Sequence, residues 1–259
     1  MDNQNSHPDR LARIKRRLRK SRLLSIFMGC PYPAPRWEKA VKRVIRELGQ
    51  EARILDLGSG LDRRAPNVIN LEIEANLNVD LVADGHFLPF RDEVFDAVIT
   101  EAVLEHVREP KQMVAEINRV LKTHGYVCAA VPFLQGFHAS PHDYQRYTVP
   151  GFDYLFSGFV KIEGGACAGP TASLHWVFRE YVGLCLSFGN LLLAKLISLT
   201  IGWLTFPLVW LDYLLMYNKH SHILASAVYF IGQKNSLRPD RFYSSPVSTP
   251  LSGLAPRQY

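Results

Sequence analysis

The alternation of apolar and polar residues in the first half of the chain predicts an α/β arrangement. Residues 54–57 (ILDL) form a short apolar run that leads directly into Gly58-Ser59-Gly60, which is typical of a buried strand followed by a tight turn. Three further apolar runs predict strands that each end in polar residues. Between residues 37 and 48, apolar side chains recur at spacings of three and four, which predicts an amphipathic helix before the first strand.

The second half continues this pattern, with one departure. A further helix is expected to begin at Pro110 and to end at His124-Gly125, and three further strands are expected at residues 126–131, 159–162 and 225–231. Between the last two strands lies an apolar block, at about residues 172–217. Its longest uncharged run has sixteen residues (196–211), fewer than the ~20 that span a bilayer, and Pro207 interrupts it. We therefore expect a helical insertion that caps the active site, forms a homodimer interface or dips into a membrane surface.

Polar residues mark the ends of the first four strands. The first strand carries Asp56 and ends at the Gly58-Ser59-Gly60 turn, where glycine allows the backbone to approach a ligand closely. The next three strands end at Glu72, at Asp84 and at Thr100-Glu101. In a parallel sheet these ends share one edge, where nucleotide-type ligands bind.

Four segments carry a family resemblance: LDLGSG, DLVADGHFLPF, VFDAVITEAVLEHV and EINRVLKTHGYVCAAVPF. Over residues 37–133, and more weakly to residue 234, the chain resembles class I S-adenosylmethionine-dependent methyltransferases of the small-molecule type 11 group. The segments PHDYQRYT and ASAVYFIGQK resemble a bacterial subgroup with mostly unassigned substrates. The resemblance implies a Rossmann-like sheet of seven strands, mostly parallel with the last strand antiparallel, with helices on both faces.

The resemblance also implies a binding site for S-adenosylmethionine. Asp56 would lie near the amino group of the cofactor, Glu72 would accept hydrogen bonds from the ribose, with Glu74 as the alternative, and Asp84 would accept from the adenine amine. The implied cofactor-binding set is Asp56, Gly58, Ser59, Gly60, Glu72, Asp84, Gly85, His86, Thr100 and Glu101.

The loop after the fifth strand supplies candidates for the acceptor side. His142 is a candidate general base, because the pKa of an ordinary histidine lies near neutrality, and Asp143 could orient it. Alternatively, Asp143 pairs with Arg146 and fixes the loop. The candidate substrate pocket consists of His138, Tyr144, Arg146 and Tyr147.

Two connections depart from the family pattern. Residues 61–67 and 74–79 leave little room for the helices that usually cross over between parallel strands, since such connections take a dozen or more residues. The pocket wall beside the methionine half of the cofactor is therefore expected to differ from that of a usual family member.

Charge and cysteine content bound the remaining possibilities. The net charge is +6, but residues 9–23 alone hold eight basic side chains and one acidic one, so the rest of the chain is close to neutral. We expect a basic arm at residues 1–36, a methyltransferase domain at 37–235 and a disordered tail at 236–259. The four cysteines show no paired spacing, so neither a disulfide framework nor a metal site is expected.

These features together predict a cytoplasmic methyltransferase, either free or peripheral on the inner face of the membrane. Its acceptor is expected to be a small or lipid- or glycan-linked molecule, such as one of quinone or cell-surface glycan metabolism, because the insertion offers an apolar wall. No specific nucleic acid is expected, since the near-neutral domain carries TEAV where RNA methyltransferases carry NPPY. The alternative is a non-catalytic scaffold of the same fold that binds a partner through the apolar insertion.

Overall fold

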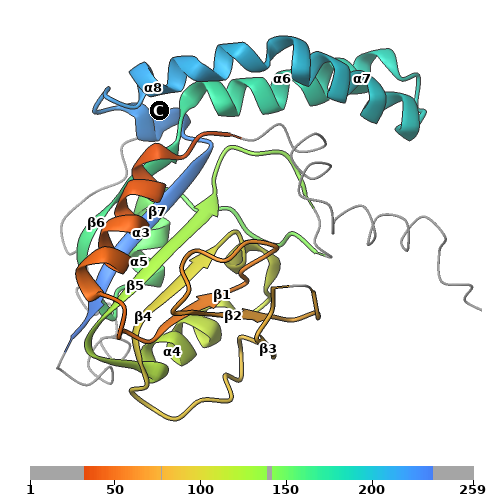
Figure 1. Cartoon of the computed structure of the whole chain (residues 1–259). Coiled ribbons are helices and arrows are strands. Elements are labelled where there is room, and N and C mark those ends of the chain that lie inside the picture. Colours follow the sequence, from red (N-terminus) through yellow and green to blue (C-terminus); the bar gives the residue numbers. More distant parts are fainter. Residues whose placement is uncertain (1–31, 77, 139–141, 236–259) are drawn as a thin grey trace, which may run out of the picture.

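The computed structural model describes residues 32–76, 78–138 and 142–235, in which a seven-stranded sheet is the central element (Figure 1). The strand order is β3-β2-β1-β4-β5-β7-β6, and β7 is antiparallel to both of its neighbours while β1 to β5 are parallel. The predicted Rossmann-like sheet with an antiparallel last strand is thus confirmed. The strands are β1 (Ile54–Leu57), β2 (Val68–Glu72), β3 (Leu81–Val82), β4 (Phe95–Glu101), β5 (Leu121–Pro132), β6 (Phe159–Ala168) and β7 (Ala227–Lys234).

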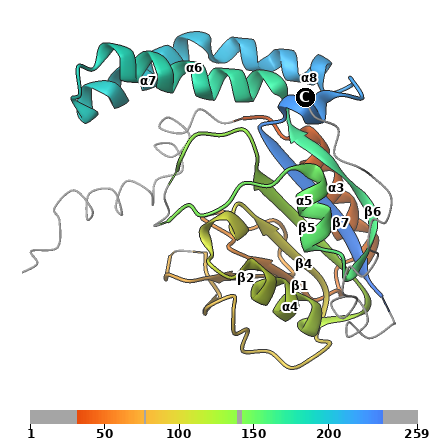
Figure 2. The ribbon, with the colours of Figure 1, turned by 180° about the vertical axis from the view of Figure 1, so that it is seen from behind.

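Helices cover both faces of the sheet, as expected (Figures 1 and 2). The amphipathic helix α3 (Pro35–Leu48) buries Trp37, Val41 and Val44 against one face, in a cluster that includes Ile99 of β4 and Ile231 of β7. On the other face, α4 (Pro110–Val120) and α5 (Val149–Leu155) pack in a second cluster, around side chains of β4, β5 and β7. Short 3-10 turns, η1 (Leu104–His106) and η3 (Ser221–Leu224), follow β4 and precede β7.

The connections from β1 to β2 and from β2 to β3 contain no helix among their described residues. Polar contacts hold these loops on the sheet instead. Arg63 binds both carboxylate oxygens of Asp80 at 2.7 and 2.8 Å, and the buried Asn70 amide donates to the carbonyls of Asp62 and Asn78. The short crossovers inferred from the sequence are therefore present, and hydrogen-bonded loops replace the usual helices there.

A second layer of helices is inserted between β6 and β7 and lies across one end of the sheet (Figures 1 and 2). It consists of α6 (Pro170–Leu186), α7 (Leu191–Thr205), η2 (Phe206–Leu211) and α8 (Asp212–Leu215). The carboxylate of Asp212, which is 1% exposed, accepts hydrogen bonds from the amides of Thr171 and Ala172 and so ties the last helix to the start of α6. We refer to residues 170–215 as the helical layer.

The helical layer buries small and polar side chains and exposes large apolar ones. The buried residues of α7 are Ala194, Ser198 and Gly202, four residues apart. This stripe faces α6, where Gly183 lies so close that a Cβ atom would come within 2.6 Å of the Ala194 carbonyl oxygen. Exposed side chains of the layer include Leu174, Phe178, Leu184, Phe188, Leu192, Leu196, Leu204, Trp210 and Leu214.

The stretch from α7 to α8 (Leu191–Leu215) is long and apolar enough to cross a membrane by length and composition, and only 22% of its most apolar window is buried. The uncharged run counted in the sequence was shorter because it began after Lys195. This helix packs along α6, so the two form an antiparallel pair.

Several element boundaries differ from the expected ones. Helix α4 ends at Val120 and β5 begins at Leu121, five residues earlier than expected, because Leu121 pairs with Phe95 of β4 before the register shifts. Strand β6 runs on to Ala168 because it pairs with the whole of β7. The basic arm before residue 32 and the expected tail from residue 236 lie outside the described residues.

Candidate active site

The turn after β1 is held in place by its glycines and by Glu72. Gly58 and Gly60 have φ values of 79° and 66°, in the left-handed region that favours glycine. A Cβ atom on Gly58 would lie 2.1 Å from the side chain of Val103, whereas the space beside Gly60 is open. The Glu72 carboxylate, at the end of β2, accepts a hydrogen bond of 2.6 Å from the Gly60 amide. The turn and the end of β2 therefore form one unit.

Asp56 lies at the centre of this edge of the sheet and is 1% exposed. Its Oδ2 accepts a hydrogen bond of 2.8 Å from Nε of Arg64, and Nη2 of the same guanidinium lies 2.6 Å from the Glu101 carboxylate at the end of β4. Burial raises the pKa of Asp56 to about 6, although the positive charge of Arg64 opposes this shift. Arg64 was not predicted as a site residue; its position in the shortened crossover was the available signal.

Several buried polar atoms at or near this edge lack a hydrogen-bond partner among the described residues; they include Asp56 Oδ1, Ser59 Oγ and Thr100 Oγ1, and also Asn70 Oδ1 on the strand beside Asp56. Asp56 and Thr100 come from neighbouring strands, since Leu57 of β1 pairs with Thr100 of β4. Buried polar atoms in proteins are rarely left unpaired, so a group of them indicates a ligand with complementary polar atoms. The amino acid end of S-adenosylmethionine carries such atoms, and the residues present fit it.

Asp84, just beyond the two-residue strand β3, is organised by its neighbour His86. The Asp84 carboxylate accepts a hydrogen bond of 2.9 Å from the His86 amide and lies 2.7 Å from His86 Nδ1. Partial burial raises the pKa of Asp84, but these hydrogen bonds outweigh it and hold the pKa below its usual value. Gly85 is buried against Met113 and Leu57, and a Cβ atom there would lie 2.6 Å from the terminal methyl group of Met113. Asp84 therefore presents an ionised carboxylate.

In the loop after β5, Asp143 pairs with Arg146. Both guanidinium Nη atoms bond the carboxylate, which also accepts a hydrogen bond of 2.9 Å from the His138 amide. This is the pairing considered above as the alternative to a His142–Asp143 dyad. The proposed roles of His142 as a base and Asp143 as its orienting partner remain predictions, because no contact described here tests them.

Two of the four predicted pocket residues, Tyr144 and Arg146, lie at the same hollow of the surface. Asp143, Tyr144 and Arg146 line a shallow hollow of about 280 Å³ with Gln135, Phe137 and Gln145. Tyr147, nearby in the chain, donates a hydrogen bond of 2.6 Å to Gln145, and burial raises the pKa of its hydroxyl to about 12. His138 contacts Trp176 of α6, with ring centroids 5.8 Å apart, so the helical layer reaches this loop.

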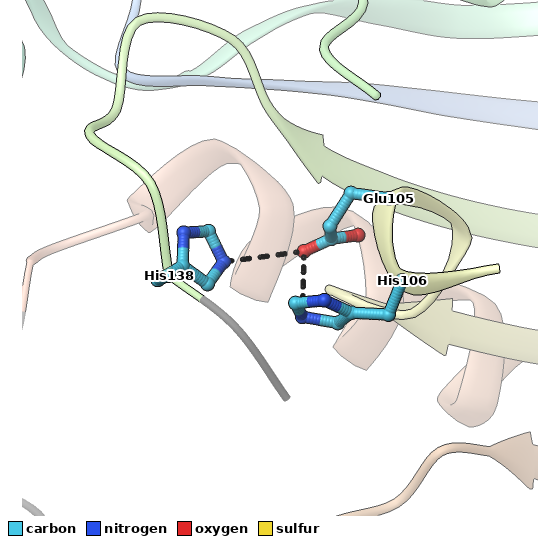
Figure 3. A group of neighbouring side chains, drawn as sticks. All are labelled: Glu105, His106 and His138. Carbon is cyan, nitrogen blue, oxygen red and sulfur yellow. Dashed lines mark ion pairs between the residues drawn. The ribbon is translucent and has the colours of Figure 1, made fainter. Parts of the chain in front are cut away.

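Glu105 and His106, in the short turn η1, extend the site in a way that the sequence did not predict. Glu105 is fully buried, and the ring of His138 from the β5 loop lies against that of His106, with centroids 5.3 Å apart (Figure 3). The Tyr144 amide also donates a hydrogen bond of 2.8 Å to the Glu105 carbonyl. The end of β4 and the loop after β5 are thus joined through these residues.

Comparison with known proteins is consistent with this geometry. Residues 40–129 match the family model described as "Methyltransferase domain". An uncharacterised protein of Methanocaldococcus jannaschii is 31% identical over 105 residues, which cover 36% of this chain and 49% of that protein, so the chain spans about half of that relative. A protein of Thermotoga maritima named demethylmenaquinone methyltransferase is 27% identical over 168 residues, covering 58% of this chain and 68% of that protein.

A solved structure shows the same fold. Phosphoethanolamine N-methyltransferase 2 of Haemonchus contortus, in complex with phosphomonomethylethanolamine and S-adenosylhomocysteine, superposes with a TM-score of 0.50 at 15% identity, over 78% of this chain and 53% of that one. Residues 40–129 thus match a methyltransferase domain model, and the seven-stranded sheet has the fold of class I S-adenosylmethionine-dependent methyltransferases. S-adenosylmethionine is accordingly its cofactor.

Proposed function

We propose that the protein transfers a methyl group from S-adenosylmethionine to a small or lipid-linked acceptor at a membrane surface. The observation that carries the enzymatic part is the group of unpaired buried polar atoms on Asp56, Ser59 and Thr100. The cofactor supplies an electrophilic methyl group on a sulfonium that already carries its leaving group. The protein then has to bind the cofactor, align the acceptor with the methyl group and exclude water.

In this proposal, each carboxylate at a strand end binds a different part of the cofactor. Oδ1 of Asp56 accepts from the ammonium group, Glu72 accepts from the ribose hydroxyls, and Asp84 accepts from the adenine amine. The open space beside Gly60 admits the cofactor to this edge. The three carboxylates and Gly60 lie at or just beyond the ends of the neighbouring strands β1, β2 and β3, and nucleotides bind at such an edge of a parallel sheet.

Arg64 receives a role that follows from its contacts. It neutralises Asp56 and Glu101 in the free protein, with only 25% of its side chain exposed. Since Asp56 Oδ1 is unpaired, the ammonium group of the cofactor can bind there while Arg64 stays on Oδ2. We assign the guanidinium to the carboxylate of the methionine moiety, because a guanidinium pairs with carboxylates through a fork of donors.

The membrane part of the proposal is supported by the helical layer. Its outward residues are large and apolar, while its inward stripe of Ala194, Ser198 and Gly202 follows the small-xxx-small spacing of helices that associate in lipid. Burying each large apolar side chain gains roughly 1.5–3 kcal/mol, so such a face favours leaving water. The eight basic side chains at residues 9–23 would add attraction to anionic lipid.

An apolar acceptor agrees with this location. Trp176 of α6 packs on His138 in the loop beside the hollow, so a molecule delivered along the helical layer arrives next to the site. The Thermotoga maritima relative bears the name demethylmenaquinone methyltransferase, and a quinone of that kind is an apolar acceptor. This supports a lipid-soluble substrate class rather than a particular compound.

Calorimetric titration of S-adenosylhomocysteine tests the cofactor site. Glu72→Gln should weaken binding of S-adenosylhomocysteine at least about tenfold, which corresponds to a loss of about 1.4 kcal/mol of binding free energy. Glu74→Gln, two residues further on, should leave the affinity unchanged. Arg64→Gln should weaken the binding of S-adenosylhomocysteine but not the binding of methylthioadenosine, because methylthioadenosine lacks the amino acid portion. If the folded wild type bound neither ligand, the enzymatic proposal would fail and the scaffold alternative would replace it.

Co-sedimentation with phosphatidylcholine–phosphatidylglycerol vesicles tests the membrane part. The paired substitution Phe188→Asp and Leu192→Asp should release the protein from vesicles, since both side chains are exposed at the tip of the helical layer. Phe87→Asp is the matched control, because Phe87 is 72% exposed but belongs to the loop after β3. Equal binding by all variants would contradict the proposed surface, and a concentration-dependent dimer lost in the paired variant would favour a protein interface.

A further inference from the structure

Three side chains that could bind a metal, Glu105, His106 and His138, lie close together where the end of β4 meets the loop after β5, which we call the acceptor loop (Figure 3). One ligand atom from each lies within 4.8 Å of the other two. The Nε2 atoms of both histidines are 3.6 Å from the same carboxylate oxygen, Oε1 of Glu105. Figure 3 shows this oxygen as the point on which the two rings converge.

The second nitrogen of each ring is already occupied. Nδ1 of His106 lies 2.5 Å from the His142 carbonyl oxygen, and Nδ1 of His138 lies 3.2 Å from the Gly136 carbonyl oxygen. The His142 carbonyl only accepts, so Nδ1 of His106 carries the hydrogen. Nδ1 of His138 faces both the Gly136 carbonyl and, at 3.4 Å, the Nη2 donor of Arg146, and the shorter carbonyl contact favours the hydrogen on Nδ1 there as well. In the neutral ring, Nε2 then presents a lone pair toward Glu105. Metal-binding histidines are commonly held in this way, by a carbonyl that fixes the tautomer.

The carboxylate itself points to a missing cation. Glu105 is 0% exposed, and neither of its oxygens has a hydrogen-bond partner among the described residues. The distances of 3.6 Å to the imidazole nitrogens exceed that of a hydrogen bond. A buried carboxylate is costly, and proteins retain it when it is paired with a cation, as Glu105 can be with either histidine in its protonated form, or when it coordinates a metal.

We propose that these three residues bind a divalent metal ion of the zinc class. Two imidazoles and one carboxylate form the ligand set of many catalytic zinc sites, in which a fourth position is left for water or substrate. Tetrahedral ligands about 2.0–2.1 Å from zinc lie roughly 3.3 Å from one another. The ligand atoms therefore need only small side-chain movements to close around the ion. The site contains no cysteine, which is why the cysteine pattern did not predict it.

The location gives the ion a use in the proposed reaction. Part of the His138 ring is exposed, and its loop lines the hollow assigned to the acceptor. An acceptor hydroxyl bound at the open position would have a lower pKa, because a bound metal ion stabilises the oxygen anion. This last step rests on the proposed function, whereas the metal site itself does not.

Titration of the metal-free full chain with Co²⁺, followed by its visible absorption, tests the site directly. One ion should bind per chain, with the ligand-field bands of low coordination and without a thiolate charge-transfer band; Zn²⁺ should displace it. His138→Gln and Glu105→Gln should each weaken binding at least about tenfold. Circular dichroism checks folding, and His138→Gln suffices if Glu105→Gln does not fold.

The double variant His220→Gln and His222→Gln is the control. These histidines lie near each other before β7, with ring centroids 6.3 Å apart, and represent adventitious binding by surface imidazoles. Unchanged Co²⁺ binding by the control supports the proposal. Absence of binding by the wild type, or retention of full affinity in His138→Gln, would overturn it. None of these results depends on methyl transfer, so they remain separate from the cofactor titration.

Discussion

Helix α3 and the helical layer bury opposite kinds of side chain. Helix α3 turns Trp37, Val41 and Val44 toward the sheet and its charged residues toward water, as expected for a surface helix of a water-soluble domain. The α6–α7 pair buries Ala194, Ser198 and Gly202 and turns leucines outward. One chain thus contains a helix suited to water and a pair suited to an apolar surrounding. The difference shows that exposure, rather than hydrophobicity alone, separates a helix that belongs to the core from one whose apolar face stays exposed.

The two regions also treat buried polar groups differently. In the helical layer, two of the buried polar side chains have hydrogen-bond partners, while Arg179 Nε has none among the described residues. His175 Nε2 lies 2.8 Å from the Gly202 carbonyl oxygen, and the Ser198 hydroxyl donates a hydrogen bond of 2.9 Å to the Glu180 carboxylate. At the edge of the sheet, Asp56 Oδ1 and Thr100 Oγ1 have no partner. The helical layer is therefore complete in its internal hydrogen bonds at His175 and Ser198, whereas the strand ends await a ligand.

The largest expected difference between the two regions concerns the free energy of unfolding when a tryptophan of each is replaced by alanine. Trp37→Ala should lower the free energy of unfolding by about 3–5 kcal/mol, because the side chain is 1% exposed and fills the core under α3. Trp210→Ala should change it by less than about 0.5 kcal/mol, because Trp210 is 62% exposed. Denaturant unfolding in detergent-free buffer measures both. Comparable losses would mean that the helical layer is an ordinary core.

A smaller effect is expected from closing the space between α6 and α7. Gly183→Leu should destabilise their packing by about 1–3 kcal/mol, because even a Cβ atom meets the Ala194 carbonyl oxygen at 2.6 Å. Limited proteolysis of the helical layer and thermal unfolding report the change. Leu184→Ala, at the neighbouring exposed position, is the control, and an equal effect of both substitutions would contradict the close packing.

The smallest expected effect is the contribution of Asp56 to the pH dependence of the free energy of unfolding. Its pKa is raised from 3.8 to about 6, so the folded protein holds this proton more tightly than the unfolded chain. The resulting stabilisation is complete below pH 3.8 and is lost as pH rises through 6. Between about pH 5 and 7 the free energy of unfolding should fall by about 1 kcal/mol through this group. Asp56→Asn should remove that slope; an unchanged slope would contradict the raised pKa.

The sequence predicted the sheet well because its strands are apolar runs with polar ends. The turn at Gly58 and the helix at Trp37 follow from local rules of backbone freedom and periodicity. The start of β5 was placed late, because Lys122 and Thr123 interrupt the apolar run and its pairing with Phe95 is a long-range contact. The buried stripe of small residues in α7 could not be predicted from the hydrophobic pattern, because small residues give a weak periodic signal.

The candidate site residues that the sequence could offer are those that stand at the ends of the predicted strands. Arg64 was missed because its partners, Asp56 and Glu101, are brought together by the pairing of β1 with β4. The convergence of Glu105 and His138 depends in the same way on two loops meeting in space. Side-chain clusters assembled by tertiary structure leave no spacing pattern in the sequence.

The contact of Trp176 with His138 has a kinetic consequence. It joins α6 of the helical layer to the acceptor loop after β5. A protein held at a bilayer by this layer would meet its acceptor by diffusion in two dimensions. Its rate would follow the mole fraction of acceptor in the lipid rather than the amount per volume of solution, so added inert lipid would slow turnover by diluting the acceptor, as added buffer dilutes a dissolved substrate.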